Sequence, residues 1–523
     1  MAEETGGHVK VNDQWDAICV GAGITSLAFG ALLALRHPGV RVLLIDKHTV
    51  PGGYATVFRR PKSRAIFDCS LHKLSGVLDG GNLHRIFAEL KLEEELTLKF
   101  SEDYFETCLP EGSFTLGNEP ETVKRTLIER YPLERDALRN FFGDVEVHGR
   151  NGYYQFQMLE GNYLPEVSQL RYAHKFLKTI SVSEAFRERF KDTYLKEILG
   201  ATGIYVGGFP EDLGYLYFLH VVYATLYKGN AYVIGASQRL SDVLTRRIGA
   251  AGGGVMLGTT VRKIITNEAN EVVGVETSRG RFFAKAVYIN ASPHYALGTF
   301  FDRTAEMDTV AQKLRGLRPS RSTTTLYLTT DTDPVELGLT STETMVFSSS
   351  THEQCLTARA DAQSSDGDGA LYEKAFWRCS PTEVTNYHAL DPSGGRVICA
   401  NVLDSISHWP VRRSKEYKEK KNRAAKALMN RLLAAKPQFE GHVVSSEISS
   451  PRTYLRFTNN TDGAGYGAAV GKDLSGHVFH HNFPVKGVHF LSAWVAGPSY
   501  EAAFGFAEMK AKQWKPAQKQ PSA

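Results

Sequence analysis

Glycines and one carboxylate near the N-terminus have the spacing of a phosphate-binding turn. An apolar run over residues 17–20 leads directly into Gly21 and Gly23, and a helical pattern follows from Ile24. Gly21 permits a tight turn, and Gly23 lets backbone N–H groups approach a pyrophosphate whose charge the helix N-terminus stabilises. A second apolar run ends at Asp46, whose carboxylate can accept hydrogen bonds from both hydroxyls of an adenosine ribose.

This order of strand, glycine turn, helix, strand and acidic residue predicts a dinucleotide-binding site. Ser26 stands where a third glycine is usual, and it is small enough for close helix–strand packing. The acidic Asp46 argues against a 2′-phosphate but leaves FAD and NAD open. The Gly52-Gly53 pair, a few residues beyond Asp46, favours FAD, because flavoproteins cover the dinucleotide with a second backbone loop at this place.

Two further segments resemble a known family. GGYATVF at 52–58, followed by FDCSLHKLSG at 67–76, is similar to the opening of the flavin-dependent phytoene desaturase, carotenoid isomerase and retinol saturase superfamily. His72 resembles the retinol saturase branch in particular. The resemblance implies an amine-oxidase-like fold, FAD held without a covalent bond, and a substrate with a long apolar chain.

The C-terminal segments 450–467 and 487–508 resemble the closing part of the same superfamily. There a strand runs through a loop into a helix, for which Ser499 is a good N-cap and Glu501 lies in the first turn. The helix N-terminus would point at the N1–C2=O edge of the isoalloxazine. It would stabilise the negative charge of reduced flavin by about 1 kcal/mol.

The predicted FAD contacts come from the glycine turn, the acidic strand end, the Gly-Gly loop, one backbone contact to adenine and the C-terminal loop. They are Gly21, Gly23, Ile24, Thr25, Ser26, Asp46, Lys47, Gly52, Gly53, Tyr54, Ala55, Thr56, Val261, Ala493, Pro498, Ser499 and Tyr500. The catalytic candidates are His72, as a proton donor or a polar anchor for a substrate end, and Glu501, as an acid or base beside the flavin. Tyr466, in a glycine-rich loop, is a weaker candidate for a position near the ring or the mouth of the tunnel, and packing within that loop explains it better.

Composition excludes several other classes. The 523 residues are 42% hydrophobic and 23% charged with a formal net charge of +4, which is ordinary for a folded protein and implies no nucleic-acid partner. No stretch approaches the roughly 20 apolar residues that span a bilayer, and the N-terminal residues lack the apolar core of a signal peptide. The six cysteines are scattered, so we expect no metal site and a reduced, cytoplasmic setting.

The chain predicts an α/β fold in which a Rossmann-type FAD-binding domain is built from three segments, 14–100, 229–310 and 446–510. An interrupted α+β substrate domain fills the gaps, with a helical part at 101–228 and a sheet part at 311–445. The residues 511–523 are a tail. Strands are expected at 323–330, 344–349 and 396–403, a helix after 414, and a loose loop at 359–369. No second glycine fingerprint marks a separate nicotinamide domain.

Two segments allow more than one interpretation. The apolar, aromatic helix at 213–227 is either plain core or one wall of an apolar tunnel. The basic segment 412–423 is more typical of a solvated helix face with i,i+4 ion pairs than of a membrane patch, and peripheral membrane contact stays open.

These features predict an FAD-dependent enzyme that acts on C=C bonds of a carotenoid, a retinoid or an unsaturated acyl chain by hydride transfer at flavin N5. The motif around His72 favours reduction or isomerisation over desaturation. Two alternatives remain: a flavin amine oxidase, which shares the nucleotide-binding plan, and a non-catalytic escort protein for a lipidated partner, as in Rab escort proteins.

Overall fold

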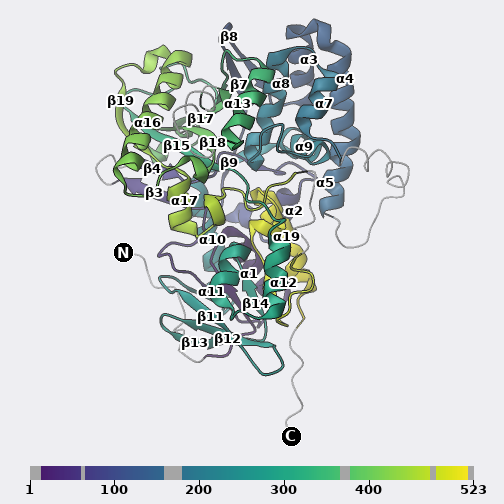
Figure 1. The fold of residues 1–523 in the computed structure, drawn as a ribbon, viewed down its shortest axis with the longest axis vertical. Helices are drawn as coiled ribbons and strands as arrows, with labels where there is room; N and C mark the ends of the chain where they lie inside the picture. Colours follow the sequence, from purple (N-terminus) through teal and green to yellow (C-terminus); the bar gives the residue numbers. More distant parts are fainter. Residues whose placement is uncertain are drawn as a thin grey trace.

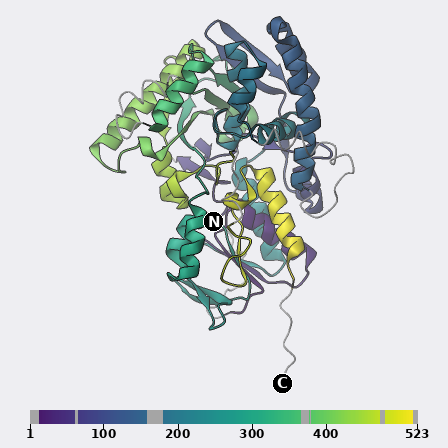
Figure 2. The same ribbon diagram turned by 45° about the vertical axis from the view of Figure 1, so that its right-hand side comes forward.

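The computed structural model describes residues 13–60, 65–157, 179–364, 377, 379–471 and 479–515. Two bodies lie one above the other in Figure 1, a parallel-sheet domain below and a larger mixed-sheet domain above. The C-terminal helix, yellow in Figure 2, lies in the lower body and reaches up to the boundary between the two.

The lower domain is built on a five-stranded parallel sheet. Its strands, in spatial order, are β10 (Gly254–Met256), β2 (Val42–Ile45), β1 (Ala17–Val20), β14 (Val287–Ile289) and β20 (Val488–Phe490). Three distant segments of the chain therefore contribute to one sheet, as the sequence predicts. β1, β2 and β14 are buried on both faces, as expected for a parallel sheet covered on each side.

Successive residues of β1 face opposite layers, because side chains alternate along a strand. Cys19 packs against three helices, and Ile18 and Val20 pack against a β-meander and two further helices. The first layer consists of α1 (Ile24–Arg36), α10 (Ala236–Ala250) and α19 (Tyr500–Gln513). The second consists of β11 (Val261–Thr266), β12 (Val272–Thr277), β13 (Gly280–Phe283), α11 (Pro293–Phe300) and α12 (Ala305–Leu314).

The upper domain is organised around a seven-stranded mixed sheet. In spatial order its strands are β19 (Val443–Ile448), β15 (Ser322–Thr330), β18 (Val397–Asp404), β17 (Thr382–Asn386), β16 (Glu343–Val346), β7 (Asp103–Leu109) and β8 (Gly112–Gly117). Only β16 and β7 pair in parallel. Strands β15, β16 and β18 were predicted, whereas β17 and β19 were not.

The first inserted block is not purely helical, because its β7–β8 hairpin extends this sheet. Most of its other described residues form helices that pack with one face of the sheet into a single core. They are α3 (Pro120–Arg130), α4 (Arg135–Asp144), the π-helix η3 (Val145–Gly149), α5 (Arg150–Gln157), α7 (Val182–Arg189), α8 (Thr193–Gly200), α9 (Tyr215–Val222) and the π-helix η5 (Tyr223–Tyr227). The last two together match the predicted helix at 213–227.

The second inserted block adds two helices. α16 (Lys415–Ala435) begins at the N-cap Ser414 and buries Tyr417, Ala424 and Leu428 at helical spacing, while most of its lysines stay outside. Its exposed Lys415–Glu419 pair fits a solvated face. α13 (His352–Ser364) includes the first part of the predicted loop at 359–369, so that part of the prediction is wrong, and the rest lies outside the described residues.

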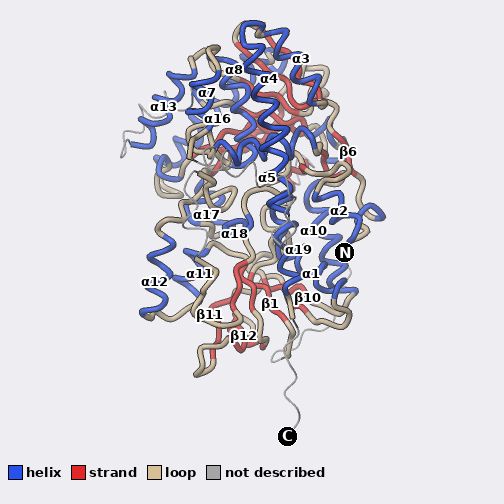
Figure 3. Tube along the Cα trace, turned by 90° about the vertical axis from the view of Figure 1, so that its right-hand side faces the viewer, coloured by secondary structure: helices blue, strands red, loops and turns tan. Residues whose placement is uncertain are grey.

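Short elements connect the two domains. They are β3 (Val57–Arg60) and β4 (Ala65–Asp68), the small sheet of β5 (Leu74–Ser75), β9 (Asn230–Val233) and β6 (Leu98–Phe100), and the helices α2 (Asn82–Glu89), α15 (Tyr387–Leu390), α17 (Pro451–Thr458) and α18 (Ala493–Ala496). Figure 3 shows α17 and α18 between the two red sheets. No helix among the described residues is long and apolar enough to cross a membrane.

Candidate functional site

The glycine turn after β1 has the geometry that the sequence predicts. Gly21 has a φ of +103°, and a Cβ there would lie 2.6 Å from the carbonyl oxygen of Asn290. A Cβ on Gly23 would lie 2.8 Å from Asn290 Nδ2. That Nδ2 is buried and has no hydrogen-bond partner among the residues that the structure describes. The turn therefore excludes side chains and leaves a buried donor beside it, which fits a phosphate-bearing ligand.

Asp46 holds the turn from the end of β2. Its carboxylate accepts hydrogen bonds from Ala22 N at 2.7 Å and from His48 N at 2.8 Å. These bonds fix the carboxylate at the cavity wall and leave further lone pairs on both oxygens. This arrangement fits the predicted role of Asp46 as an acceptor for ribose hydroxyls.

The Gly52-Gly53 loop lies directly against the glycine turn. Gly52 N donates to Ala22 O at 2.8 Å, and Gly52 O accepts from Ile24 N at 3.1 Å. Gly52 has a φ of +117°, and a Cβ there would approach Ala55 O to 2.1 Å. The second backbone loop is thus present, and it accepts the hydrogen bond of the Ile24 N–H at the start of α1.

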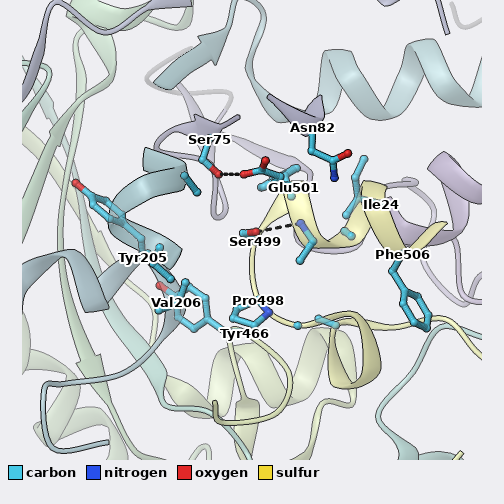
Figure 4. Close-up of a pocket in the computed structure, with 18 of the residues that line it drawn as sticks. Ile24, Ser75, Asn82, Tyr205, Val206, Tyr466, Pro498, Ser499, Glu501 and Phe506 are labelled. Carbon is cyan, nitrogen blue, oxygen red and sulfur yellow. Dashed lines mark hydrogen bonds between the residues drawn. The ribbon is translucent and has the colours of Figure 1, made fainter. Parts of the chain in front are cut away.

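Two cavities meet at this point. The larger, of about 840 Å³, is lined on one side by the glycine turn, Asp46 and Val261. The smaller, of about 430 Å³, extends between α19, α9 and the upper sheet (Figure 4). Ile24, Thr25, Tyr54 and Ala493 line both cavities. The two cavities therefore adjoin, which fits an elongated dinucleotide with its adenosine end at Asp46 and its ring system beyond Ile24.

The cavities include nearly all the predicted FAD contacts. The residues that line at least one of them are Gly21, Gly23, Ile24, Thr25, Asp46, Lys47, Gly52, Gly53, Tyr54, Ala55, Thr56, Val261, Ala493, Pro498, Ser499 and Tyr500. Ser26 is the exception. It is fully buried within α1 and lines neither cavity, because its small side chain serves helix–strand packing.

The N-terminus of α19 faces the smaller cavity, as Figure 4 shows for Ser499. The Ser499 hydroxyl accepts from Ala502 N at 3.2 Å, which confirms the predicted N-cap. Ser499 has a φ of +95°, a backbone conformation that is strained in any residue but glycine. Strain of this kind persists where the surroundings impose it, and it is frequent at ligand-binding sites.

Glu501 forms one polar group in the smaller cavity. Its carboxyl accepts hydrogen bonds from the Tyr153 hydroxyl and from Ser75 Oγ, the latter at 2.7 Å. Burial raises the pKa of Glu501, and these two hydrogen bonds oppose the increase. The side chain is thus held in place and favours its protonated form more than an exposed glutamate does. The sequence did not predict Tyr153 and Ser75 as partners of Glu501, because neither residue lies in a recognisable local motif.

His72 belongs to a second polar group, on the side of the upper sheet. His72 Nδ1 lies 2.7 Å from Thr385 Oγ1, and Nε2 lies 4.0 Å from the Glu383 carboxylate. Glu383 is 1% exposed, and burial raises its pKa. Next to it, Glu343 accepts from Lys73 Nζ at 2.8 Å and from the Tyr205 hydroxyl at 2.6 Å.

His72, Glu343 and Glu383 place ligand atoms within 4.8 Å of one another, as a metal site would. The Lys73 ammonium already supplies the positive charge beside Glu343, which argues against a metal there. The sequence prediction missed Glu383 because β17 was not expected. It missed Glu343 because this residue directly precedes the strand expected at 344–349 and nothing local marks it.

The wall between the two polar groups is apolar and aromatic. Tyr217, Val221 and Ala224 project into the cavity from α9 and η5, while Phe218 and Leu219 of the same helix are buried in the core. Burial lowers the pKa of the neighbouring His220 to about 4, so its imidazole is neutral at pH 7. The helix at 213–227 therefore packs into the core on one face and lines the cavity on another, and its role as the wall of a substrate tunnel stays a prediction. Tyr466 also lines this cavity (Figure 4).

Comparisons with known proteins agree with this site. Residues 19–90 match the NAD(P)-binding Rossmann-like domain family. Prolycopene isomerase 2 of an Oncidium hybrid cultivar is 24% identical over 499 residues, which cover 91% of this chain and 79% of the relative. The human all-trans-retinol 13,14-reductase is 23% identical over 487 residues, with 88% and 78% covered. A phytoene desaturase of Rhodobacter capsulatus is 24% identical over half of each chain.

Solved structures show the same fold. An oxidoreductase of Methanosarcina mazei superposes with a TM-score of 0.62 at 14% identity, over 95% of this chain and 100% of the other. Cyclohexylamine oxidase of Brevibacterium oxydans has a TM-score of 0.59 at 15% identity, over 96% and 98%.

The fold and the cofactor site thus define an FAD-dependent oxidoreductase of the amine-oxidase-like fold. Within that class, the chain is similar over most of its length to prolycopene isomerases and retinol 13,14-reductases and over half of it to a phytoene desaturase, in agreement with the resemblance that its motifs carry.

Proposed function

We propose that the protein acts on a C=C bond of a long apolar substrate, a carotenoid, a retinoid or an unsaturated acyl chain, and that reduction or isomerisation is favoured over desaturation. One observation carries this proposal. The cavity with the apolar and aromatic wall adjoins the dinucleotide cavity, because Ile24, Thr25, Tyr54 and Ala493 line both. A chain lying along α9 would therefore meet the ring end of the cofactor.

Reduced FAD, when bound, supplies a hydride to one carbon of the double bond. The protein must then provide a proton to the other carbon. Glu501 suits this role, because burial raises its pKa and Tyr153 and Ser75 fix its orientation. His72 is the second candidate. After a reduction, solvent restores the proton to the carboxyl. In an isomerisation the substrate instead gives back both the proton, to Glu501, and the hydride, to the cofactor.

Water exclusion supports the same proposal. Glu501 is 6% exposed, and the apolar wall formed by Val206, Val221 and Ala224 lies between the two polar groups. A hydrocarbon that fills this space displaces water with little loss of free energy, because the apolar side chains of the wall form few hydrogen bonds with that water.

Anaerobic incubation with a polyene panel tests the proposal, once with oxidised and once with prereduced protein. A product two hydrogens heavier than its substrate indicates reduction, and an unchanged mass with altered retention indicates isomerisation. Loss of two hydrogens would overturn the preferred direction. Absence of any product from every polyene would overturn the proposal itself.

Amine oxidation is the second candidate function. Cyclohexylamine oxidase shares the fold, and aromatic side chains such as Tyr205, Tyr217 and Tyr466 line the cavity, which suits a neutral amine between rings. Anaerobic flavin reduction by amines, with none by polyenes, would favour it. A chain that binds FAD but reacts with neither donor class would instead fit an escort role.

A further inference from the structure

One oxygen atom of the cavity wall is not accounted for by the fold. Glu383 Oε1 is buried and has no hydrogen-bond partner in the part of the chain that the structure describes, while Oε2 accepts from Asn401 Nδ2 at 3.3 Å. Glu383 lines the smaller cavity and is 1% exposed. A buried carboxylate oxygen without a donor is costly, so its retention points to a ligand that donates to it.

The strand explains why this oxygen faces the cavity. Along β17, Val384 packs into the core of the upper domain, so its neighbours Glu383 and Thr385 point to the opposite face of the sheet. That face lies towards the dinucleotide-binding domain, because Cys399, which pairs with Thr385, packs in the core of that domain.

His72 places a second hydrogen-bonding atom beside Glu383. Its Nδ1 is 2.7 Å from Thr385 Oγ1, and when that hydroxyl donates to Nδ1, the hydrogen of the imidazole is on Nε2. Nε2 lies 4.0 Å from Glu383 Oε2, too far for a hydrogen bond. The cavity wall therefore presents an acceptor and a donor side by side, neither satisfied by the other.

Only some ligand groups match this pair. A hydroxyl can donate to Glu383 and accept from His72 with a single oxygen, whereas an ammonium only donates and a carboxylate only accepts. The charges of the groups around Glu383 and His72 are consistent with a neutral hydroxyl ligand. The Glu343 carboxylate is already compensated by Lys73 at 2.8 Å and by the Tyr205 hydroxyl.

We propose that Glu383 and His72 bind a hydroxyl group at one end of the apolar substrate. This inference rests on the proposed function and names the substrate class, a long-chain alcohol. In Figure 4, Tyr205 and Tyr466 lie on one side of the cavity, and Ser499 and Glu501 lie on the other. Anchoring the hydroxyl on the sheet side therefore sets which double bond lies beside the cofactor, while the proton comes from Glu501.

Equilibrium binding to the FAD-loaded protein tests this proposal. The probes are all-trans-retinol and its hydrocarbon, amine and carboxylic-acid counterparts. Binding of each probe is measured by the change in flavin absorbance, and its turnover is measured as kcat/KM. We expect retinol to bind at least about 10-fold more tightly than the hydrocarbon, because a site built for a hydroxyl leaves polar groups unpaired without it.

Glu383→Gln should remove that preference and leave hydrocarbon affinity unchanged. Its amide group would direct N–H towards the cavity, since Asn401 Nδ2 keeps the carbonyl, so binding of the carboxylic acid should improve relative to retinol. Glu276→Gln, at an exposed position of β12, is the matched control and should retain the preference. If Glu383→Gln fails to fold, His72→Leu should show the same loss of preference.

Equal binding of retinol and hydrocarbon by the unaltered protein would overturn the proposal. Tighter binding of the amine, or a preference that survives both variants, would also overturn it. A protein that prefers the alcohol but converts no polyene would support the hydroxyl site and contradict the proposed reaction, so the two failures are distinguishable.

Discussion

At the residue scale, the cofactor turn depends on positions where no side chain fits. Gly21, Gly23 and Gly52 could be predicted from the sequence, because the chain must turn tightly between a strand and a helix. Asn290, which the turn contacts, could not, because no local pattern marks a residue far along the chain. The same holds for Glu383, which a strand pairing brings to His72.

Gly23→Asp should abolish retention of FAD. Its Cβ would lie 2.8 Å from Asn290 Nδ2, and its carboxylate would repel the pyrophosphate. The ratio of flavin to protein after gel filtration measures the effect. Gly143→Ala in α4, where a new Cβ meets nothing within 4 Å, is the control and should keep its flavin. Full flavin content in Gly23→Asp would contradict the assignment of the turn.

Glu501→Gln should lower turnover by about 10²- to 10⁴-fold, the range of general acid catalysis. In the unaltered protein the rate should fall as pH rises through the raised pKa of Glu501, because the protonated carboxyl is the active form. This alkaline limb should disappear in the variant. A pH–rate profile for both proteins measures it, and an identical limb in Glu501→Gln would exclude Glu501 as the donor.

Glu501→Gln should also change how the free energy of unfolding depends on pH. A carboxyl whose pKa is raised on folding contributes its stability below the unfolded pKa and loses it as pH rises through the folded pKa. The unaltered protein should therefore lose stability relative to Glu501→Gln as the pH increases above about 4.3, the ordinary glutamate value. Urea unfolding at several pH values measures the difference. A constant difference across that range would contradict a raised pKa.

At the element scale, helices and parallel strands were more predictable than the antiparallel ones. α16 and the strands β1 and β2 have clear apolar periodicity. β17 does not, because its sequence TEVTN is largely polar although every residue in it is buried. Its polar side chains are accommodated by hydrogen bonds with His72 and Asn401, which only the folded sheet provides.

Helix α9 and its continuation η5 should set the length of the substrate. Ala224→Phe would fill the cavity, and we expect the KM for a long polyene to rise at least about 10-fold, the effect of displaced apolar contacts, while FAD stays bound. Val221→Ala enlarges the same wall and should leave long substrates accepted. Steady-state kinetics with polyenes of graded length checks both. An unchanged KM in Ala224→Phe would remove this wall from the substrate site.

At the scale of the whole molecule, three chain segments meet in one sheet and enclose one cofactor. The helix α19 begins at the smaller cavity and packs with its later residues into the core of the lower domain, so it connects the last segment to both. The sequence predicted the three-segment plan because each segment carries its own motif. The β7–β8 hairpin shows where such reasoning ends, since its pairing with β16 joins residues more than two hundred positions apart.

Removal of FAD should lower the thermal stability of the whole protein. At a free FAD concentration of about 100 times Kd, binding stabilises the folded state by about 2.7 kcal/mol. For 523 residues that unfold as one unit, this corresponds to a decrease in Tm of roughly 2–3 °C on removal. Calorimetry of the stripped and reloaded protein measures it. Restoration of Tm by NAD, and not by FAD, would contradict the cofactor assignment.

The central claim, that reduced FAD and an apolar chain react in one joined cavity, is tested most directly by an anaerobic titration of prereduced protein with a polyene. Flavin absorbance and product mass are read in the same sample. We predict either one product two hydrogens heavier per flavin oxidised, or an isomer of unchanged mass with the flavin still reduced. A polyene recovered unaltered beside fully reduced flavin, across the whole panel, would contradict the account.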